Sequence, residues 1–195
     1  MAQRWPIKIS GEEIYLRPLR FRDQGVWNSV RAENRQWLAP WEATVPVIGH
    51  SGVDSLEHQL PSYFTMIRQV NREARSGRSF SFALWHEHNL IGQISLGGVI
   101  YGALRGAHIG YWIDRNYTNR GYMTQAVELV TDFAFTTLIL HRIEINLRPE
   151  NIASKRVAEK AGYILKERVL DIYTLMANGE TMSASLKKII RPTSA

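Results

Sequence analysis

The segment from Arg142 to Arg148 constrains the fold more than any other part of the chain, because polar and apolar residues alternate in it without exception. A period of two residues is that of a β-strand with one buried face. The apolar face would hold Ile143, Ile145 and Leu147. Glu144 and Asn146 share the polar face, which we also expect other elements to cover if the strand is central in its sheet. Such a strand belongs in a sheet with a covering layer.

Helical patterns flank this strand on both sides. Before it, apolar residues recur at helical spacing at Met123, Val127, Val130 and Ala134. After it, we expect a helix from about Ile152 to Ala161, because Asn151 is a good N-cap and Gly162 suits a left-handed residue after the last turn. A strand between two helices predicts a mixed α/β (α+β) fold built in layers.

The remaining patterns fit the same single domain. Strands are expected at Glu13 to Leu19, Phe80 to Trp85, Ile91 to Leu96, His108 to Ile113, Tyr163 to Ala177 and Thr181 to Ile189, with a turn at Asn178-Gly179 between the last two. Helices are expected at Arg22 to Asn34 and Tyr63 to Arg75, and an irregular interval at Pro40 to Pro61. With 195 residues, of which 45% are hydrophobic, the chain is expected to form one domain, residues 1–195.

The composition excludes several kinds of chemistry and location. The chain has no cysteine, which excludes disulfides, thiolate zinc ligands and an acyl-cysteine intermediate. No stretch reaches the ~20 apolar residues needed to cross a bilayer, so we expect no membrane association and a cytoplasmic protein. Only His86 and His88 lie close together among six histidines, so no metal site is expected. The net charge of +6 suits a polyanionic partner or cosubstrate, or merely keeps the protein soluble.

The segment from Ile109 to Thr124 is the best candidate for a binding site, because a strand runs through a polar loop into the start of a helix. Free N–H groups and the helix dipole attract anions at such a point, and Gly121 lets an anion approach the main chain. Arg115 and Arg120 would add positive charge. The pattern therefore suits a pyrophosphate, although an ordinary capped connection would look the same.

Several motifs taken together resemble the GNAT acetyltransferase superfamily and, within it, the RimJ/RimL-type protein N-acetyltransferases. They are Leu16-Arg17-Pro18-Leu19, His141-Arg142-Ile143-Glu144, Asn151-Ile152-Ala153-Ser154 and Glu159-Lys160-Ala161-Gly162-Tyr163. The family's loop reads Gln/Arg-x-x-Gly-x-Gly/Ala, and the chain keeps its Gly121 but has Thr118 and Met123 at the other two positions. The resemblance implies a central mixed, mostly antiparallel sheet of about seven strands flanked by helices.

The resemblance also implies acetyl-CoA as cosubstrate and assigns residues to it. The pantetheine arm would bind the backbone of Tyr111, Trp112 and Ile113, where one strand splays from the next. The pyrophosphate would bind the loop at Thr118, Asn119, Arg120, Gly121, Tyr122, Met123 and Thr124. Asn151 would face the pantetheine, and Arg156 or Lys155 would reach a nucleotide phosphate, unless these two only form a solvated helix face.

The catalytic assignments follow from the polar strand face and from the family. Asn146 stands where some relatives carry a catalytic Glu, which makes Glu144, acting through a water, the candidate base. A structural hydrogen-bonding role for Glu144 is the alternative. Ala158 stands at the position of the family's frequent tyrosine acid, so the resemblance gives Ser154 that role. Ser154 could instead only help to cap its helix. Tyr163 and Tyr173 are the alternative candidates for the acid.

The expected function is acetyl transfer from acetyl-CoA to an amine by direct attack in a ternary complex. An α-amine has a pKa of ~7.7–8.0 and a lysine amine ~10.4, so a weak base favours a protein N-terminus, for example that of a ribosomal protein. Trp37, Trp41, Tyr63 and Glu42 could line the acceptor site, or be core aromatics and a solvated carboxylate. The alternatives are a small-amine acetyltransferase and a non-catalytic CoA-binding or ribosome-binding or RNA-binding protein. Direct nucleic-acid binding is not expected, because no nucleic-acid-binding motif is present. The chain is expected to be a monomer or a homodimer.

Overall fold

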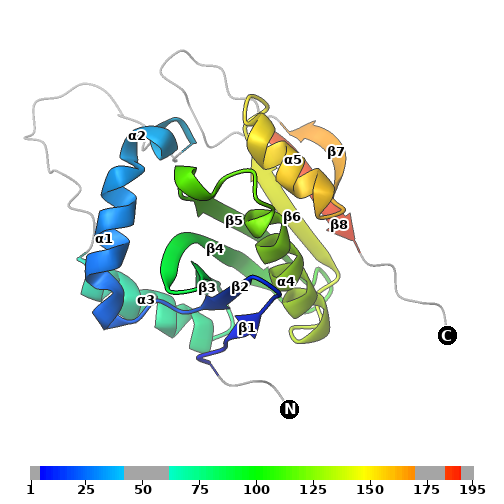
Figure 1. Ribbon diagram of the computed structural model, residues 1–195. Coiled ribbons are helices and arrows are strands. Elements are labelled where there is room, and N and C mark those ends of the chain that lie inside the picture. Colours follow the sequence, from blue (N-terminus) through cyan, green and yellow to red (C-terminus); the bar gives the residue numbers. More distant parts are fainter. Residues whose placement is uncertain (1–4, 42–61, 170–182, 190–195) are drawn as a thin grey trace, which may run out of the picture.

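The computed structural model describes residues 5–41, 62–169 and 183–189, which form one twisted sheet with helices on both faces (Figure 1). The sheet has eight strands in the order β1-β2-β3-β4-β5-β6-β8-β7. The strands are β1 (Ile9–Ser10), β2 (Ile14–Arg17), β3 (Phe80–His86), β4 (Asn89–Ile100), β5 (Gly106–Ile113), β6 (Arg142–Leu147), β7 (Ile164–Val169) and β8 (Ser183–Ile189). Every neighbouring pair is antiparallel except β5 and β6, which are parallel.

The helices form two layers. They are α1 (Gln24–Glu33), α2 (Arg35–Leu38), α3 (Tyr63–Arg75), α4 (Tyr122–Thr136) and α5 (Ile152–Lys160), with short 3₁₀ turns η1 (Phe21–Asp23), η2 (Ala39–Trp41) and η3 (Arg115–Tyr117). Side chains of α4 and α5 pack in the larger hydrophobic cluster, and those of α1 and of the first half of α3 in the smaller one. Because successive side chains of a strand point to opposite faces, the two clusters lie on opposite sides of the sheet.

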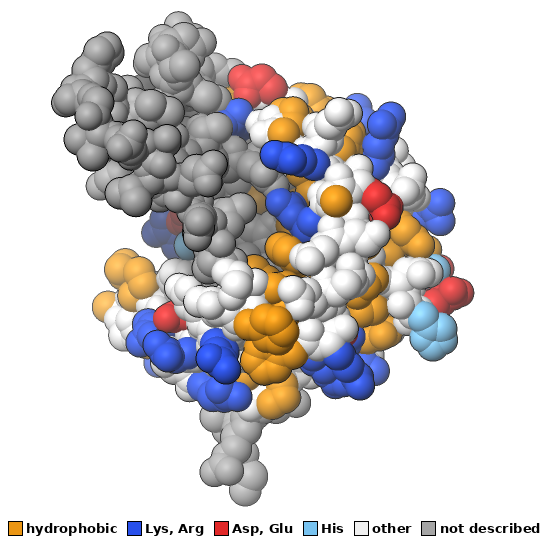
Figure 2. Space-filling model, turned by 90° about the vertical axis from the view of Figure 1, so that its left-hand side faces the viewer, with side chains coloured by type: hydrophobic (Ala, Val, Ile, Leu, Met, Phe, Trp, Pro, Cys, Tyr) orange, Lys and Arg blue, Asp and Glu red, His pale blue; other side chains and the backbone are white. Residues whose placement is uncertain are grey.

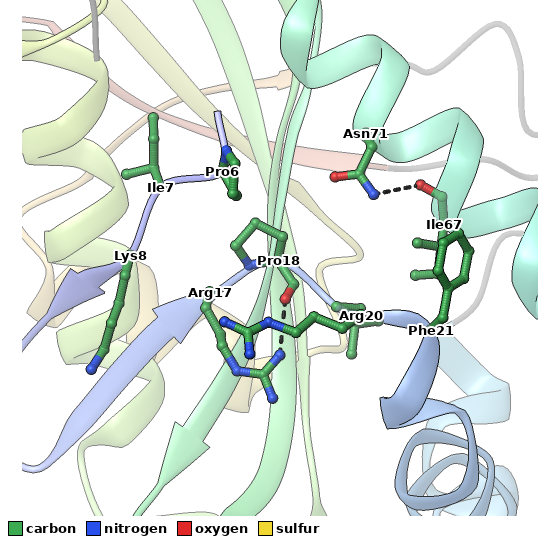
Figure 3. A pocket seen from close by; sticks show the side chains of 10 residues that line it. Pro6, Ile7, Lys8, Arg17, Pro18, Arg20, Phe21, Ile67 and Asn71 are labelled. Atoms are coloured by element: carbon green, nitrogen blue, oxygen red, sulfur yellow. Dashed lines mark hydrogen bonds between the residues drawn. The ribbon is translucent and has the colours of Figure 1, made fainter. Parts of the chain in front are cut away.

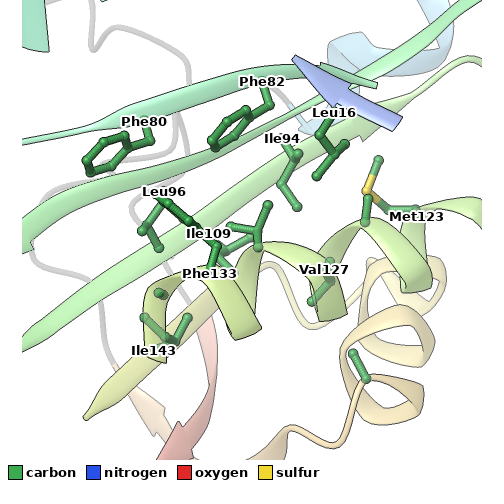
Figure 4. Close-up of a cluster of buried hydrophobic side chains, with 14 of the residues drawn as sticks. Leu16, Phe80, Phe82, Ile94, Leu96, Ile109, Met123, Val127, Phe133 and Ile143 are labelled. Atoms are coloured by element: carbon green, nitrogen blue, oxygen red, sulfur yellow. The ribbon is translucent and has the colours of Figure 1, made fainter. Parts of the chain in front are cut away.

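The larger core lies between the sheet and α4 (Figure 4). Phe82, Ile94 and Ile143 from three strands are fully buried, and Val127 of α4 packs in the same cluster. Each large apolar side chain buried in this way contributes roughly 1.5–3 kcal/mol relative to exposure. This packing fixes the position of the first turn of α4 relative to the end of β5.

Most sequence expectations for the fold are confirmed, including the fold class, the helix at Tyr63 to Arg75 and the strand beginning at Arg142. The Asn151 side chain does cap α5, and Gly162 has the left-handed φ of 80°. The sheet has one strand more than about seven, because β1 has only two residues and leaves no periodicity in the sequence. The expected turn at Asn178-Gly179 and most of the interval Pro40 to Pro61 lie outside the described residues.

Candidate active site

The sheet opens between β5 and β6. These two strands pair from Gly106↔Arg142 to Ile109↔Ile145, and there the pairing stops. Beyond that point β5 continues for four residues, from Gly110 to Ile113, which pair with β4 alone. Along this stretch, main-chain groups on the β6 side have no partner strand among the described residues. The expected splay at Tyr111, Trp112 and Ile113 is therefore present in the fold.

A close approach on the other side of β5 keeps the end of this strand beside β4. A Cβ atom on Gly92 of β4 would lie only 2.5 Å from the Trp112 carbonyl oxygen, so only glycine lets the two backbones come so near. Directly after β5, the Asp114 N–H donates to the Ile91 carbonyl at 2.8 Å. The end of β5 thus follows β4, while β6 continues in its own direction.

A small hollow lies beside the opening. It measures about 240 Å³ and is lined by Gln93, Ser95, Gly110, Tyr111 and Trp112. The Gln93 side chain is fixed at both ends, because its oxygen accepts from the Trp27 indole at 3.3 Å and its NH₂ donates to the Ser81 hydroxyl at 2.8 Å. The lining residues carry no charged side chain. The hollow can hold a small neutral polar group next to the exposed main chain of β5.

The loop before α4 has the geometry of an anion site. Gly121 is the N-cap of α4 and has a φ of 85°, which other residues adopt only with strain. A Cβ on Gly121 would meet nothing within 4 Å, so the space in front of the helix end is open. The side chains of Tyr122 and Met123 are buried, and therefore these residues can offer a ligand only their backbone N–H groups. This end of a 15-residue helix fits a pyrophosphate.

Side chains around the loop hold it in place. The Tyr122 hydroxyl is 3.0 Å from Nε2 of His86, and Arg120 stacks over the ring of Tyr117. On the other side, the backbone N–H of Arg115 donates to the buried Asn34 side chain at 2.8 Å. Of the other expected ligands, Thr118 is partly buried, Asn119 is exposed with a φ of 61°, and Thr124 is partly buried.

The α5 side of the opening carries a hydrogen-bonded pair, Tyr111 and Ser154. The Tyr111 hydroxyl lies 2.9 Å from the Ser154 hydroxyl and 3.1 Å from the Ser154 carbonyl oxygen. Burial raises the pKa of Tyr111 to about 12, although the hydrogen bond to Ser154 opposes the shift. Tyr111 is therefore a neutral phenol at physiological pH. Asn151 accepts from the Ser154 backbone N–H at 3.0 Å, which fixes the first turn of α5.

Sequence reasoning missed the Tyr111 side chain, since it assigned only the backbone of this residue to the site. One signal was available, because Tyr111 is two residues beyond Ile109 and thus on the face of β5 that α4 and α5 cover. The distance of 43 residues between Tyr111 and Ser154 left no pattern in the sequence that connects them. Of the two residues expected to reach a nucleotide phosphate, Arg156 is exposed, and the Lys155 ammonium nitrogen lies 3.8 Å from a carboxylate oxygen of Glu159.

The polar face of β6 differs from expectation. We expected other elements to cover this face, but Asn146 is exposed, since β5 has left β6 at that level. Glu144 is partly buried, stands opposite His108 in the paired part of β5, and forms an ion pair with Arg142. Asn146 is thus the residue of β6 beside the opening, while Glu144 lies two residues further from it.

The aromatic residues proposed for an acceptor wall fall into two groups. Trp37 and Trp41 are 36% and 40% exposed, whereas Tyr63 is buried and its hydroxyl donates to the Arg20 carbonyl. The Trp pair belongs to α2 and η2, which the Arg148 side chain joins to β6 by donating to the Pro40 carbonyl at 2.8 Å. These short helices therefore lie next to the end of β6.

The remaining expectations concern Tyr163 and Tyr173 as alternative acids, Glu42 as an acceptor residue, metal ions and membrane spans. Tyr163 is buried, and its hydroxyl lies 2.7 Å from that of Thr131, so it is held in the core. Tyr173 and Glu42 lie outside the described residues. Within the part of the chain that the structure describes, no group of three or more His, Asp or Glu side chains could hold a metal ion, and no helix is long and apolar enough to cross a membrane.

Comparisons with known proteins agree with this geometry. The family model described as "Acetyltransferase (GNAT) domain" matches residues 13–164. The probable N-acetyltransferase YjcK of Bacillus subtilis is 35% identical over 80% of this chain and 82% of its own. The [ribosomal protein uS5]-alanine N-acetyltransferase of Escherichia coli is 26% identical over 80% and 78%.

A solved structure, that of Mycobacterium smegmatis RimJ in complex with CoA-disulfide, superposes with a TM-score of 0.82 and 29% identity, covering 97% of this chain and 91% of RimJ. The fold, the opening in its sheet and these matches lead to one assignment. The chain belongs to the GNAT acetyltransferase family, as an acetyl-CoA-dependent N-acetyltransferase.

Proposed function

We propose that the protein acetylates the N-terminal α-amine of a protein, for example a ribosomal protein, by direct attack on acetyl-CoA in a ternary complex. The observation that carries the proposal is the break between β5 and β6, which has the uncharged hollow on one side and the Tyr111–Ser154 pair on the other. The relatives named for ribosomal-protein substrates support the choice of acceptor.

The opening suits the cosubstrate. The main chain of Tyr111 to Ile113 offers hydrogen bonds to the pantetheine arm, and the first turn of α4 offers N–H groups to the pyrophosphate. A backbone N–H beside the thioester carbonyl would stabilise the negative charge that develops on its oxygen during attack. Asn151, the N-cap of α5, would face the pantetheine, and the exposed Arg156 in the same helix would reach a nucleotide phosphate.

The leaving group needs a proton, and the Tyr111–Ser154 pair can provide it. When the amine nitrogen forms its bond to the acetyl carbon, the C–S bond breaks and the sulfur leaves with the electron pair. The Ser154 hydroxyl would donate its proton to that sulfur while it takes the proton of the neutral Tyr111 hydroxyl, and Tyr111 would then recover a proton from water, which receives the one that the amine gives up. This assignment replaces the tyrosine that is absent at Ala158.

The acceptor must lose a proton, and the hollow itself holds no base. Its lining residues bear no carboxylate. Glu144 would therefore act through a water, in the direction of Asn146 at the opening. Deprotonation through a water is sufficient for an α-amine, because roughly one α-amine in ten is already uncharged at neutral pH. It would deprotonate a lysine amine poorly, because the pKa of that amine is higher.

The test compares amines of different pKa. Acetyl-CoA consumption would be measured with peptides that begin with a free Ala or Ser, with the same peptides blocked at the N-terminus and carrying one lysine, and with spermidine. We expect kcat/KM for the free α-amine to exceed that for lysine by about two orders of magnitude at pH 7. A preference for spermidine would replace the proposal with a small-amine acetyltransferase. Acetyl-CoA binding without turnover of any amine would leave only a CoA-binding role.

The order of events has its own measurement. The chain has no cysteine to carry the acetyl group. Double-reciprocal plots of the initial rate against one substrate, at several fixed concentrations of the other, should therefore give intersecting lines, as expected for a ternary complex. Parallel lines would indicate an acetyl-enzyme intermediate and contradict direct attack.

A further inference from the structure

One side of the molecule gathers positive charge around exposed aromatic rings. In α3, residues 64, 68, 72 and 75 recur at helical spacing and lie along one stripe. The stripe consists of Phe64, Arg68, Arg72 and Arg75, and all four side chains are exposed. Glu73 is the acidic residue of this helix, and its carboxylate is bound to Arg78 at 2.7 Å. The stripe therefore keeps its positive charge.

A second segment adds to the stripe. Arg20, Phe21 and Arg22 are exposed at η1, and the rings of Phe21 and Phe64 lie 5.3 Å apart. The two phenylalanines are 46% and 48% exposed, which is unusual for rings that could have packed inside. We call the surface formed by Arg20, Phe21, Arg22, Phe64, Arg68 and Arg72 the arginine face. No ion pair between described residues neutralises its arginines.

A hollow adjoins the arginine face (Figure 3). It measures about 310 Å³, its floor includes the buried Ile67 and Leu19, and its rim carries Lys8 and Arg20. Figure 2, which views the side of the molecule on the left of Figure 1, shows Lys and Arg side chains around exposed hydrophobic ones. Exposed apolar side chains and an adjoining hollow are thus bordered by basic side chains.

From this combination we infer that the arginine face binds single-stranded RNA. The arginines match the phosphates of a backbone, and the exposed rings match unstacked bases, since aromatic rings on a basic surface are the platform on which single strands stack. An acidic protein segment would satisfy the charges but would not require ring faces. The face shares no residue with the hollow beside β5, so it would act independently of acetyl transfer.

Direct nucleic-acid binding was not expected from the sequence, which contains no binding motif. Our inference departs from that expectation because the structure brings together two segments that are more than 40 residues apart in the chain. The Tyr63 hydroxyl, which donates to the Arg20 carbonyl at 2.8 Å, holds the start of α3 against η1.

The test uses the full-length protein and a fluorescent 20-nucleotide oligouridine in anisotropy titrations at several salt concentrations. The variant Arg68→Gln/Arg72→Gln lowers the net charge from +6 to +4. The control variant Arg105→Gln/Lys160→Gln lowers it by the same amount outside the arginine face, because Arg105 lies in the β4–β5 turn and Lys160 in the last turn of α5. We expect the first variant to reduce the slope of log affinity against log salt by about 1.4, and the control to leave it nearly unchanged.

A second variant tests stacking. Phe64→Ala should weaken oligouridine binding roughly fivefold or more without changing the salt slope. Two results would overturn the inference: equal slopes for the two charge variants, or displacement of the RNA by polyglutamate of equal charge together with no effect of Phe64→Ala. Acetylation of a peptide by Arg68→Gln/Arg72→Gln should equal that of the unmodified protein, and this readout separates the RNA site from the transferase site.

Discussion

Replacement of Tyr111 by Phe removes one hydroxyl from the wall of the opening and leaves the ring in place. The hydroxyl is within 2.9 Å of the Ser154 hydroxyl and 3.1 Å of its carbonyl, and it has one proton to donate. The net loss is that of about one hydrogen bond, or ~1 kcal/mol. If this energy orients Ser154 toward the departing sulfur, kcat should fall roughly fivefold or more, with little change in the KM for acetyl-CoA.

The assay is thiol release with a saturating free-amine peptide, measured in a double-mutant cycle. Ser154→Ala should lower kcat, and Tyr111→Phe should add nothing in that background if Tyr111 acts through Ser154. Tyr163→Phe is the matched control, because it removes a buried hydroxyl that lies 2.7 Å from Thr131, in the core. It should cost similar stability and leave kcat unchanged.

The reasoning is refuted if Tyr111→Phe lowers kcat by the same factor with and without the Ser154 hydroxyl. It is also refuted if Tyr163→Phe lowers kcat as much. A pH series provides a further check: the folded pKa of Tyr111 is about 12, above that of a free tyrosine at ~10. Above pH 10 the unfolded chain alone loses this proton, so stability falls as pH rises toward 12, and Tyr111→Phe should make that decline shallower.

Three other substitutions test the framework of the site. Gly92→Ala should shift β5, because the added methyl carbon would lie 2.5 Å from the Trp112 carbonyl; we expect a loss of about 1–3 kcal/mol in unfolding experiments and weaker CoA binding in calorimetry. Gly121→Ala meets open space, so its cost is the strain of a φ near 85°, about 1 kcal/mol, and CoA affinity should fall while the fold persists by circular dichroism. Asp23→Asn should cost about 3 kcal/mol at pH 7, because it leaves Arg17 without its partner at 2.7 Å. Burial alone would raise the pKa of Asp23, but hydrogen bonds from Arg17 and the Arg20 N–H outweigh it and lower the pKa. The stabilisation by Asp23 is therefore present above pH ~4 and is lost as the pH falls further. In urea unfolding, the difference in unfolding free energy between Asp23→Asn and the unmodified protein should be smaller at pH 3 than at pH 7.

Local patterns in the sequence predicted much of the fold. The alternation from Arg142, the N-cap at Asn151 and the glycine at Gly162 each depend on neighbouring residues, and each matches the structure. The start of α4 at Gly121 was predictable for the same reason, since a glycine in a left-handed conformation serves the turn where it stands. Short periodicities and caps involve residues that are close together along the chain, so they can be recognised from the sequence alone.

The working parts of the site depend on contacts between distant residues. At the opening of the sheet, the end of β5 stays beside β4 through the close approach of Gly92 to Trp112, which no periodicity reveals. The Tyr111–Ser154 pair joins residues 43 positions apart, and the arginine face joins η1 to α3. Sequence alone thus determined the elements, because each is stabilised by residues close along the chain. Only the tertiary structure decided which side chains meet, because the packing of whole helices against the sheet sets those distances.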